Sequence, residues 1–260
     1  AAGCGSGWQG RAAIAQTEAV VSVGRRRSAV PPLPDPCLPV VETFHSLQGE
    51  GLHAGRSALF IRLGGCSVGC SWCDTKHSWP AAQHPSLPLS VLVQQTQAAA
   101  AAGAAFVVIT GGEPLHHDLG PLCAALRQGD GTQALPLHLE TSGVDPLSGR
   151  FDWITLSPKP HRPPTTELLA ACDELKVVVS EPADLAFAEA MGQAARLGRL
   201  QQDRSQACRH SGEPASAEGP ALLLQPAWDN PQGQHLALEH VRRHPHWRLS
   251  LQTHKWLQIR

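Results

Sequence analysis

Short hydrophobic runs alternate with helical patterns from about Val40 to the end of the chain. Strands are expected at residues 59–63, 106–110, 137–140, 153–156, 175–179, 222–224 and 247–251. Helices are expected between them at residues 90–102, 118–128, 183–197 and 235–244, the first with a serine cap and a closing Gly103. This alternation predicts an α/β fold with a parallel sheet covered by helices. The sheet is expected to be either open and doubly wound or curved into a whole or partial barrel.

Two stretches fall outside the alternation. Residues 1–36 combine small residues with the basic run 25–27 and a proline-rich run at 31–36. Such a composition buries little apolar surface, so we interpret it as a disordered or targeting-like N-terminal extension. Residues 199–220 are polar and poor in large apolar side chains, which predicts a flexible insertion within a single domain at residues 37–260.

The composition of the chain argues against nucleic acid and membranes as binding partners. The chain has 21 basic and 22 acidic residues, so no broad positive field is expected to bind nucleic acid. No run approaches the roughly 18 to 20 apolar residues that span a bilayer, so no membrane partner is expected. We predict a cytoplasmic enzyme with a small-molecule substrate. In that compartment thiols stay reduced, so the eight cysteines favour metal ligation over disulfides.

Three of the cysteines lie close together, directly after the expected strand at 59–63. Cys66, Cys70 and Cys73 can bind three irons of a cubane cluster and leave the fourth iron without a protein ligand. Structural zinc, with His77 nearby, is one alternative, although zinc normally takes four ligands. Unrelated buried cysteines are the other. No role is assigned to the remaining five, Cys4, Cys37, Cys123, Cys172 and Cys208, and burial is expected for Cys123 and Cys172.

A Gly-Gly-Glu-Pro turn at residues 111–114 follows the expected strand at 106–110. It should lie at the same edge of the sheet as the cysteine loop. Two glycines allow the backbone to approach a ligand closely, although such a tetrapeptide alone marks only a turn.

Together, the cysteine spacing, Trp72 before the last cysteine and the glycine turn resemble the radical S-adenosylmethionine (radical SAM) superfamily. The resemblance implies a partial or modified (β/α) barrel and a [4Fe-4S] cluster on Cys66, Cys70 and Cys73. The open iron would chelate the methionine part of S-adenosylmethionine, and one electron would cleave a C–S bond to give a 5′-deoxyadenosyl radical. Trp72 would lie near the adenine, unless it is simply a core residue.

Further segments, in order along the chain, resemble 7-carboxy-7-deazaguanine synthases. They are residues 42–51 (ETFHSLQGEG), 73–75 (CDT), 139–143 (LETSG), 157–159 (SPK), 225–228 (QPAW) and 250–255 (SLQTHK). The resemblance implies a carbon–nitrogen lyase of queuosine and 7-deazapurine biosynthesis. It would convert 6-carboxy-5,6,7,8-tetrahydropterin to 7-carboxy-7-deazaguanine with loss of ammonia, and regenerate S-adenosylmethionine.

The same resemblance implies site residues. By this resemblance, the residues expected to contact the substrate are Leu47, Gln48, Gly49, Arg62 and Thr110. Arg62 offers a planar fork to the pterin carboxylate, and a surface ion pair is its alternative role. Contacts to S-adenosylmethionine carry over to Gly112, Ser157, Pro158, Lys159, Gln225, Pro226, Ala227 and Trp228, with Glu113 and Glu140 as secondary candidates.

Metal and partners are implied in the same way. Mg²⁺ is expected at Thr75, because a single hydroxyl suits a hard octahedral cation that keeps most of its shell from elsewhere. The alternative for Thr75 is a turn residue. A homodimer and an electron donor such as flavodoxin or ferredoxin are also expected.

Two rival functions use the same cysteines. A glycyl-radical-activating enzyme would act on a protein partner, but residues 47–50 and 73–75 count against it. A non-enzymatic iron–sulfur or zinc module would require a fourth ligand and would depend on metal for stability.

Overall fold

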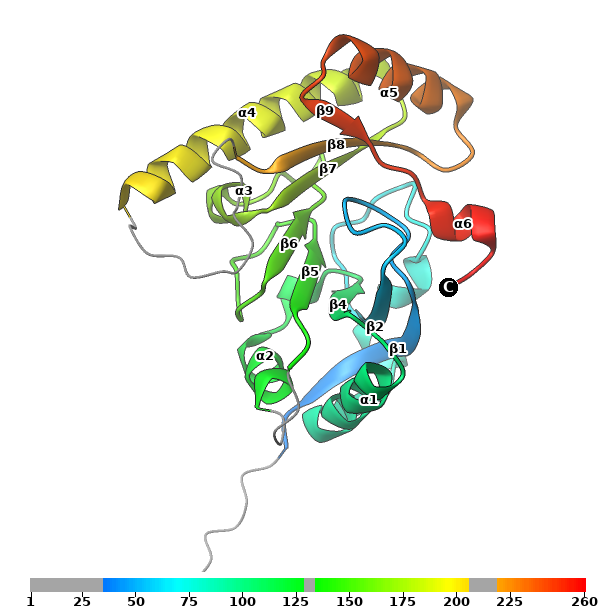
Figure 1. Cartoon of the computed structure of the whole chain (residues 1–260), viewed down its shortest axis with the longest axis vertical. Helices are drawn as coiled ribbons and strands as arrows, with labels where there is room; N and C mark the ends of the chain where they lie inside the picture. The colour runs from blue at the N-terminus through cyan, green and yellow to red at the C-terminus, as the bar shows by residue number, and fades with distance from the viewer. Residues whose placement is uncertain (1–34, 129–133, 206–218) are drawn as a thin grey trace, which may run out of the picture. The chain divides into compact units, whose positions relative to one another are not determined.

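Nine strands form one sheet within residues 35–128, 134–205 and 219–260, which the computed structural model describes (Figure 1). Their order is β3-β1-β2-β4-β5-β6-β7-β8-β9. Neighbours from β2 to β9 are parallel, whereas β1 is antiparallel to β2 and β3. The strands are β1 Cys37–Leu47, β2 Ser57–Leu63, β3 Ser86–Pro88, β4 Phe106–Gly111, β5 Leu137–Thr141, β6 Trp153–Leu156, β7 Glu174–Val179, β8 Ala221–Pro226 and β9 Trp247–Leu249. The predicted α/β fold with a parallel sheet is confirmed.

Most of the helices cover the convex side of the curved sheet. The helices of the described residues are α1 Leu89–Ala101, α2 Gly120–Arg127, α3 Thr166–Ala171, α4 Pro182–Ser205, α5 Pro231–Arg243 and α6 Thr253–Leu257, and short 3-10 turns lie at Lys76–Ser78, Ala81–Gln83 and Pro114–His116. Figure 1 shows α1 to α5 outside the sheet and α6 apart from them, near the C-terminus. No helix among the described residues has the length and apolar character needed to cross a membrane.

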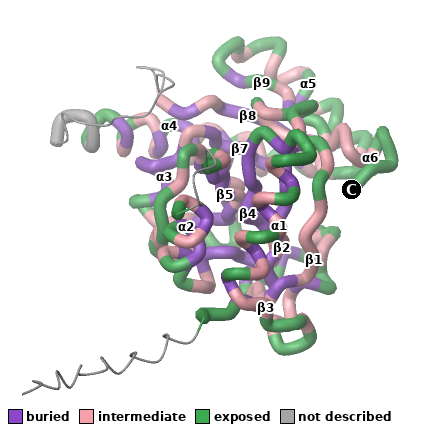
Figure 2. The backbone as a smooth tube through the Cα atoms, turned by 60° about the horizontal axis from the view of Figure 1, so that its bottom comes forward, coloured by how far each residue is buried: buried purple, intermediate pink, exposed green. Residues whose placement is uncertain are grey.

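The pleat of the strands separates an apolar outer face from a polar inner face. Residues such as Val107, Ile109 and Leu139 belong to the large core cluster beneath the helices. Their neighbours in sequence point to the other face of the sheet, because successive strand side chains alternate. There Phe60 and Phe106 form a small apolar cluster. Figure 2 shows the central strands buried along most of their length, whereas the residues of α6 are half-buried or exposed.

The loop between β1 and β2 lies against this inner face. The backbone N–H of Leu52 donates to Glu174 in β7 at 2.9 Å, and that of Gly51 donates to Ser250 at 3.0 Å. The loop therefore crosses from one side of the curved sheet to the other and brings residues 48–51 beside β7 and the C-terminal segment.

Several elements differ from the sequence prediction. Strands β1 and β3 and helices α3 and α6 were not expected. The first strand was expected at residues 59–63, but residues 42–47 already belong to β1. Helix α1 begins without a serine cap, and the Ser90 N–H instead donates to Asp35 at 3.2 Å. Helix α5 begins at Pro231 because the Asn230 side chain accepts from the Gly233 N–H at 2.8 Å.

The boundary of the predicted insertion is also corrected. Helix α4 continues to Ser205, so residues 199–205 are helical. Arg199 is buried and donates to the carbonyl of Cys172 at 3.0 Å, which docks this part of the helix on the end of α3. Residues 206–218 lie outside the described part, as do residues 1–34 of the predicted N-terminal extension. The proposed domain division stays a prediction.

Candidate active site

A cavity of about 480 Å³ opens where the parallel strands reach their C-terminal ends. Among its lining residues are all three clustered cysteines and most of the residues predicted to bind the metal, cofactor and substrate. These are Cys66, Cys70, Cys73, Thr75, Gly112, Ser157, Lys159, Gln225, Pro226, Ala227, Trp228, Gln48, Gly49, Arg62 and Thr110. Leu47 and Pro158 are not in the lining, since Leu47 is exposed at the end of β1 and Pro158 is buried beside the cavity wall.

The cysteine loop fits an iron–sulfur cluster. Cys66, Cys70 and Cys73 are free thiols that line the same cavity. Burial raises the pKa of the Cys66 and Cys70 thiols, and the other cysteines of the loop raise it further. Iron would be needed to hold them as thiolates at neutral pH. His77, the histidine considered for zinc, does not line the cavity.

Three side chains from distant elements hold the cysteine loop in place. His116 accepts a hydrogen bond from the Ser67 N–H at 3.0 Å, and its other ring nitrogen is bonded to Asp145. Arg162 donates to the Ser67 carbonyl at 2.6 Å. His161 is bonded to the Val68 carbonyl at 3.1 Å. Sequence reasoning missed these residues, because the partners lie 49 to 95 positions from the loop and share no motif with it.

Trp72 is 44% exposed and makes an edge contact with His161, their ring centroids 5.8 Å apart. It therefore lies at the cavity rim and is not a core residue. Cys123 and Cys172 are buried, as expected, and burial raises the pKa of Cys172 to about 12.

The glycine turn packs against the cysteine loop. A Cβ at Gly111, which has φ of +140°, would lie 2.2 Å from the carbonyl oxygen of Leu63. A Cβ at Gly112 would lie 2.3 Å from the carbonyl oxygen of Gly65 and 2.9 Å from the Cβ of Cys66. These positions thus require glycine for contact between two backbone segments. The same closeness places Gly112 beside the first cluster cysteine.

The carboxylate of Glu113 accepts hydrogen bonds from other residues of the protein. It accepts hydrogen bonds from the Leu115 N–H, the Thr141 hydroxyl, and both the N–H and the hydroxyl of Ser142. Four donors saturate a carboxylate, so Glu113 positions the turn against β5 and is a poor candidate for the amine of a bound cofactor.

On the inner face of the sheet, Glu140 links two of the residues that were predicted to contact the substrate. Its two carboxylate oxygens accept from Gln48 Nε2 and from Thr110 Oγ1, each at 2.9 Å. Gln48 in turn accepts from the Glu50 N–H at 3.1 Å. Arg62 donates from Nε to Glu42 at 3.0 Å, which is the ion pair considered as its alternative role, and it also lines the cavity.

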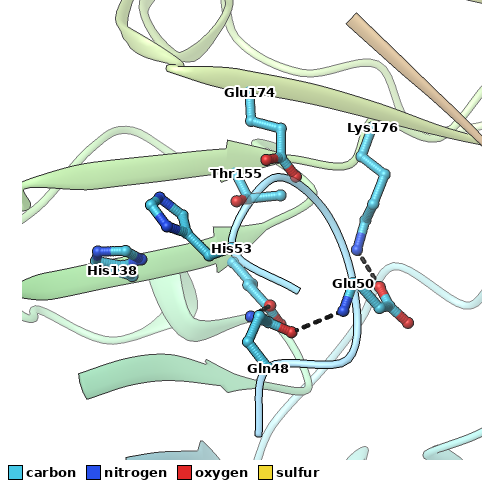
Figure 3. A pocket seen from close by; sticks show the side chains of 8 residues that line it. Gln48, Glu50, His53, His138, Thr155, Glu174 and Lys176 are labelled. Atoms are coloured by element: carbon cyan, nitrogen blue, oxygen red, sulfur yellow. Dashed lines mark hydrogen bonds and ion pairs between the residues drawn. The ribbon is translucent and has the colours of Figure 1, made fainter. Parts of the chain in front are cut away.

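An ion pair between buried Lys176 and partly buried Glu50, near Glu140, was not predicted. Figure 3 shows Lys176 from β7 directed at Glu50 in the β1–β2 loop, with Glu174 nearby. Burial alone raises the pKa of Glu50, but the charge of Lys176 and hydrogen bonds from Lys176 and Gln252 lower it to about 2. Burial alone lowers the pKa of Lys176, but Glu50 and Glu140 outweigh it and raise the pKa. Burial raises the pKa of Glu174.

Another part of the cavity wall consists of residues at the ends of β6 and β8 and of residues from the C-terminal segment. Lys159 donates to the carbonyl and hydroxyl oxygens of Ser157 at 2.6 and 2.8 Å, and burial lowers its pKa. Gln225 accepts from Ser250 at 2.8 Å. Lys255 donates to Asp74, next to the last cysteine, at 2.6 Å and lies 5.3 Å from the Trp228 ring.

Thr75 precedes the first 3-10 turn. Its side chain does not cap that turn, and its hydroxyl lies 3.5 Å from the Cys73 sulfur at the cavity wall. Thr75 is also a turn residue, the alternative considered for it, because its carbonyl oxygen accepts from the Ser78 N–H at 2.8 Å.

Comparisons with known proteins agree with this geometry. Residues 60–159 match the model of the Radical SAM superfamily. The 7-carboxy-7-deazaguanine synthase of Prochlorococcus marinus is 50% identical over 226 residues, which cover 86% of this chain and 98% of that protein. The corresponding synthase of Escherichia coli (strain K12) is 33% identical, with coverage of 85% and 98%. A crystal structure of QueE from Escherichia coli has a TM-score of 0.63 and 28% identity, and the match covers 84% of this chain and 95% of that chain.

These matches confirm the predicted family and partial-barrel fold, and they exclude the two rival functions. Enzymes of the radical SAM superfamily use a [4Fe-4S] cluster and S-adenosylmethionine, which are therefore the cofactors of this protein. With relatives above 30% identity over most of its length, the chain belongs to the 7-carboxy-7-deazaguanine synthase family, a family of radical SAM lyases.

Proposed function

We propose that the cavity converts 6-carboxy-5,6,7,8-tetrahydropterin to 7-carboxy-7-deazaguanine with loss of ammonia. The observation that carries the proposal is that the three cluster cysteines, Arg62 and the Glu140 network line one cavity. When bound, the cluster and S-adenosylmethionine supply the electron and the radical that remove hydrogen from the pterin. The role of the protein's own residues is to hold S-adenosylmethionine and the pterin in the correct relative orientation and to exclude water.

Cys66, Cys70 and Cys73 bind the cluster, and the Gly111–Gly112 backbone sets the edge of the cofactor site. Lys159 places a cation beside Cys70, where it can attract the carboxylate of the methionine group. Residues 225–228 line the part of the cavity that would hold the nucleoside. Ser157 also lines the cavity and would contact the cofactor. Pro158 shapes this segment from behind the wall.

The pterin lies against the inner face of the sheet. Glu42 fixes Arg62 through Nε, which leaves other N–H donors of the guanidinium for the pterin carboxylate. Gln48, Gly49 and Thr110 line the same region, and Glu140 orients Gln48 and Thr110. Leu47 acts indirectly, as the residue from which the Gln48–Gly49 segment leaves β1.

Mg²⁺ binds beside Thr75 in this proposal. The hydroxyl faces the cavity and is not used to cap the turn, so it can supply one oxygen while substrate oxygens and water supply others. Neighbouring Asp74 is held by Lys255 and is a less suitable ligand.

Two further parts of the proposal rest on chemistry and on the family. One-electron cleavage needs a reduced carrier, for which flavodoxin or ferredoxin is suited, and an oxygen-labile cluster suits the cytoplasm. The proposal that the protein is a homodimer rests on its resemblance to the family.

The test is anaerobic. Cluster-reconstituted protein is supplied with dithionite, Mg²⁺, S-adenosylmethionine and 6-carboxytetrahydropterin, and product is followed by mass spectrometry. We expect product from the wild type and from Cys37→Ser, which removes an exposed thiol away from the cavity, but not from Cys70→Ala. If wild type releases 5′-deoxyadenosine but no 7-carboxy-7-deazaguanine, the proposed substrate is wrong.

A further inference from the structure

A second group of metal-ligating side chains lies away from the cavity, between α4 and α5. Glu189 is in α4, His240 is in α5, and His244 follows the last turn of α5. One ligand atom from each lies within 4.8 Å of the others. None of the three lines the active-site cavity. We propose that Glu189, His240 and His244 form a binding site for a divalent transition metal of the Zn²⁺ type.

The two histidines are arranged as a chelating pair. They are four residues apart at the end of one helix, so both rings project from the same face. The rings are stacked, with centroids 4.0 Å apart and planes inclined by 18°. Nδ1 of His244 lies 2.9 Å from the carbonyl oxygen of His240. If Nδ1 carries the proton for this hydrogen bond, Nε2 keeps its lone pair, the arrangement found in many metal-binding histidines.

Glu189 completes the group from the neighbouring helix. Its Oε1 lies 2.8 Å from Nε2 of His240. Donor atoms around zinc, each about 2.0 to 2.2 Å from the metal, are separated by roughly 3.3 Å, so a small side-chain rotation admits an ion between them. Two imidazoles and one carboxylate suit Zn²⁺ far better than Mg²⁺, which prefers oxygen ligands.

The carboxylate is held by the protein core. The indole N–H of Trp247, a side chain only 2% exposed, donates to the same Oε1 of Glu189 at 2.8 Å. A hydrogen bond of this kind fixes the orientation of a metal-ligating side chain in many metal sites. His246 lies near the second carboxylate oxygen, with Nε2 4.0 Å from Glu189 Oε2, and can approach as a fourth ligand.

An ordinary ion pair explains only part of this arrangement. His240 and Glu189 alone would satisfy each other, and a helix-to-helix contact needs nothing more. The stacked His244 and the adjacent His246 add two further imidazoles around the same carboxylate, which an ion pair does not require. Bound metal would join α4 to α5 and to the segment that leads into β9 (Figure 1). It would thus brace the C-terminal β/α unit from its outer side.

The experiment uses Zn²⁺ with the cluster-loaded protein under anaerobic conditions. Excess metal is removed by gel filtration, and bound zinc is counted and examined by X-ray absorption at the zinc edge, which separates imidazole from sulfur ligands. We expect one zinc per chain with histidine scattering in the wild type, and at least tenfold weaker binding in His244→Ala. The matched control is His235→Ala, on an exposed position of α5, which should bind like the wild type.

His244→Ala keeps the His240–Glu189 contact, so its folding should be preserved, and thermal unfolding of the zinc-free protein checks this. Zinc should raise the midpoint temperature of the wild type and of His235→Ala by several degrees and leave that of His244→Ala unchanged. Zinc that is bound only through sulfur, or equally well by His244→Ala, would overturn the proposal.

Discussion

The charges of buried Lys176 and partly buried Glu50 should contribute more to stability than any other pair of single residues in the site. Taking a lone charge out of water is costly, and the cost is offset only while its partner is present and well placed. Glu50 also accepts from Gln252 at 2.9 Å, and Lys176 is attracted by Glu140 and Glu174. The pair therefore holds the β1–β2 loop, which carries the proposed substrate contacts Gln48 and Gly49, against β7.

Glu50→Gln should destabilise the protein by about 3 kcal/mol at neutral pH, because it leaves Lys176 charged and buried with weaker compensation. The pKa of Glu50 is lowered from 4.5 to about 2, so its carboxylate stabilises the fold fully above about pH 4.5. That stabilisation is lost as the pH falls towards 2. Urea unfolding should show a constant gap between wild type and variant from pH 8 to 5 and a smaller gap at pH 3.

The matched control for this substitution is Glu239→Gln. It removes exposed pairs with Arg242 and Arg243 on α5 and should cost less than about 1 kcal/mol. A gap for Glu50→Gln no larger than that of Glu239→Gln, or one that stays the same at pH 3, would contradict the proposed role of the pair.

At the scale of elements, the cysteine loop depends on support from two other segments of the chain. Ser67 and Val68 are held by His116 after β4 and by His161 and Arg162 after β6. A loop has little internal structure of its own, so its shape is set by such contacts. The arrangement makes His116 a positioning residue, oriented by Asp145, and not a ligand of the cluster.

His116→Ala should lower the iron retained after reconstitution and reduce kcat/KM by about tenfold, equivalent to about 1.4 kcal/mol. His116→Gln should recover part of the loss, because its amide oxygen can still accept from Ser67. Iron analysis and the electron paramagnetic resonance spectrum of the reduced cluster provide the readout. Full iron content and an unchanged spectrum in His116→Ala would show that the loop holds its shape without this contact.

The elements also show what the sequence could predict. Residues 106–110 and 153–156 were recognisable as strands because each is a short run of β-branched, aromatic and other apolar residues. Strand β1 was not, because Glu42, His45 and Ser46 interrupt its apolar pattern and one of its neighbours is the short edge strand β3. Helix α4 was predicted too short, because the burial of Arg199 depends on contact with α3.

The same distinction applies to the site. The cysteines and the glycine turn are contiguous in sequence, so their spacing predicted their chemistry. The Glu50–Lys176 pair joins residues 126 positions apart, and nothing at either position marks the other. Such contacts are created only when the curved sheet brings β7 opposite the β1–β2 loop.

Across the whole domain, the C-terminal segment closes one side of the cavity. Thr253 donates to the carbonyl of Gly49 at 2.9 Å through both its N–H and its hydroxyl. Lys255 reaches Asp74 beside the cluster loop, 181 positions away. The last part of the chain thus links the proposed substrate loop to the cluster loop, although α6 itself is short and contains no fully buried residue.

Lys255→Met should weaken this closure without destabilising the fold. Asp74 is 56% exposed at its side chain, and ion pairs in such positions contribute about 0 to 1 kcal/mol, so the midpoint of thermal unfolding should shift by only about 1 or 2 °C. The KM for S-adenosylmethionine should rise several-fold, because Lys255 also braces Trp228 on the proposed cofactor wall. Salt screens exposed charges, so the wild-type KM should rise with ionic strength while that of Lys255→Met changes little. An unchanged KM in Lys255→Met, or equal salt dependence in both proteins, would mean that the C-terminal segment covers the cavity without contributing to binding.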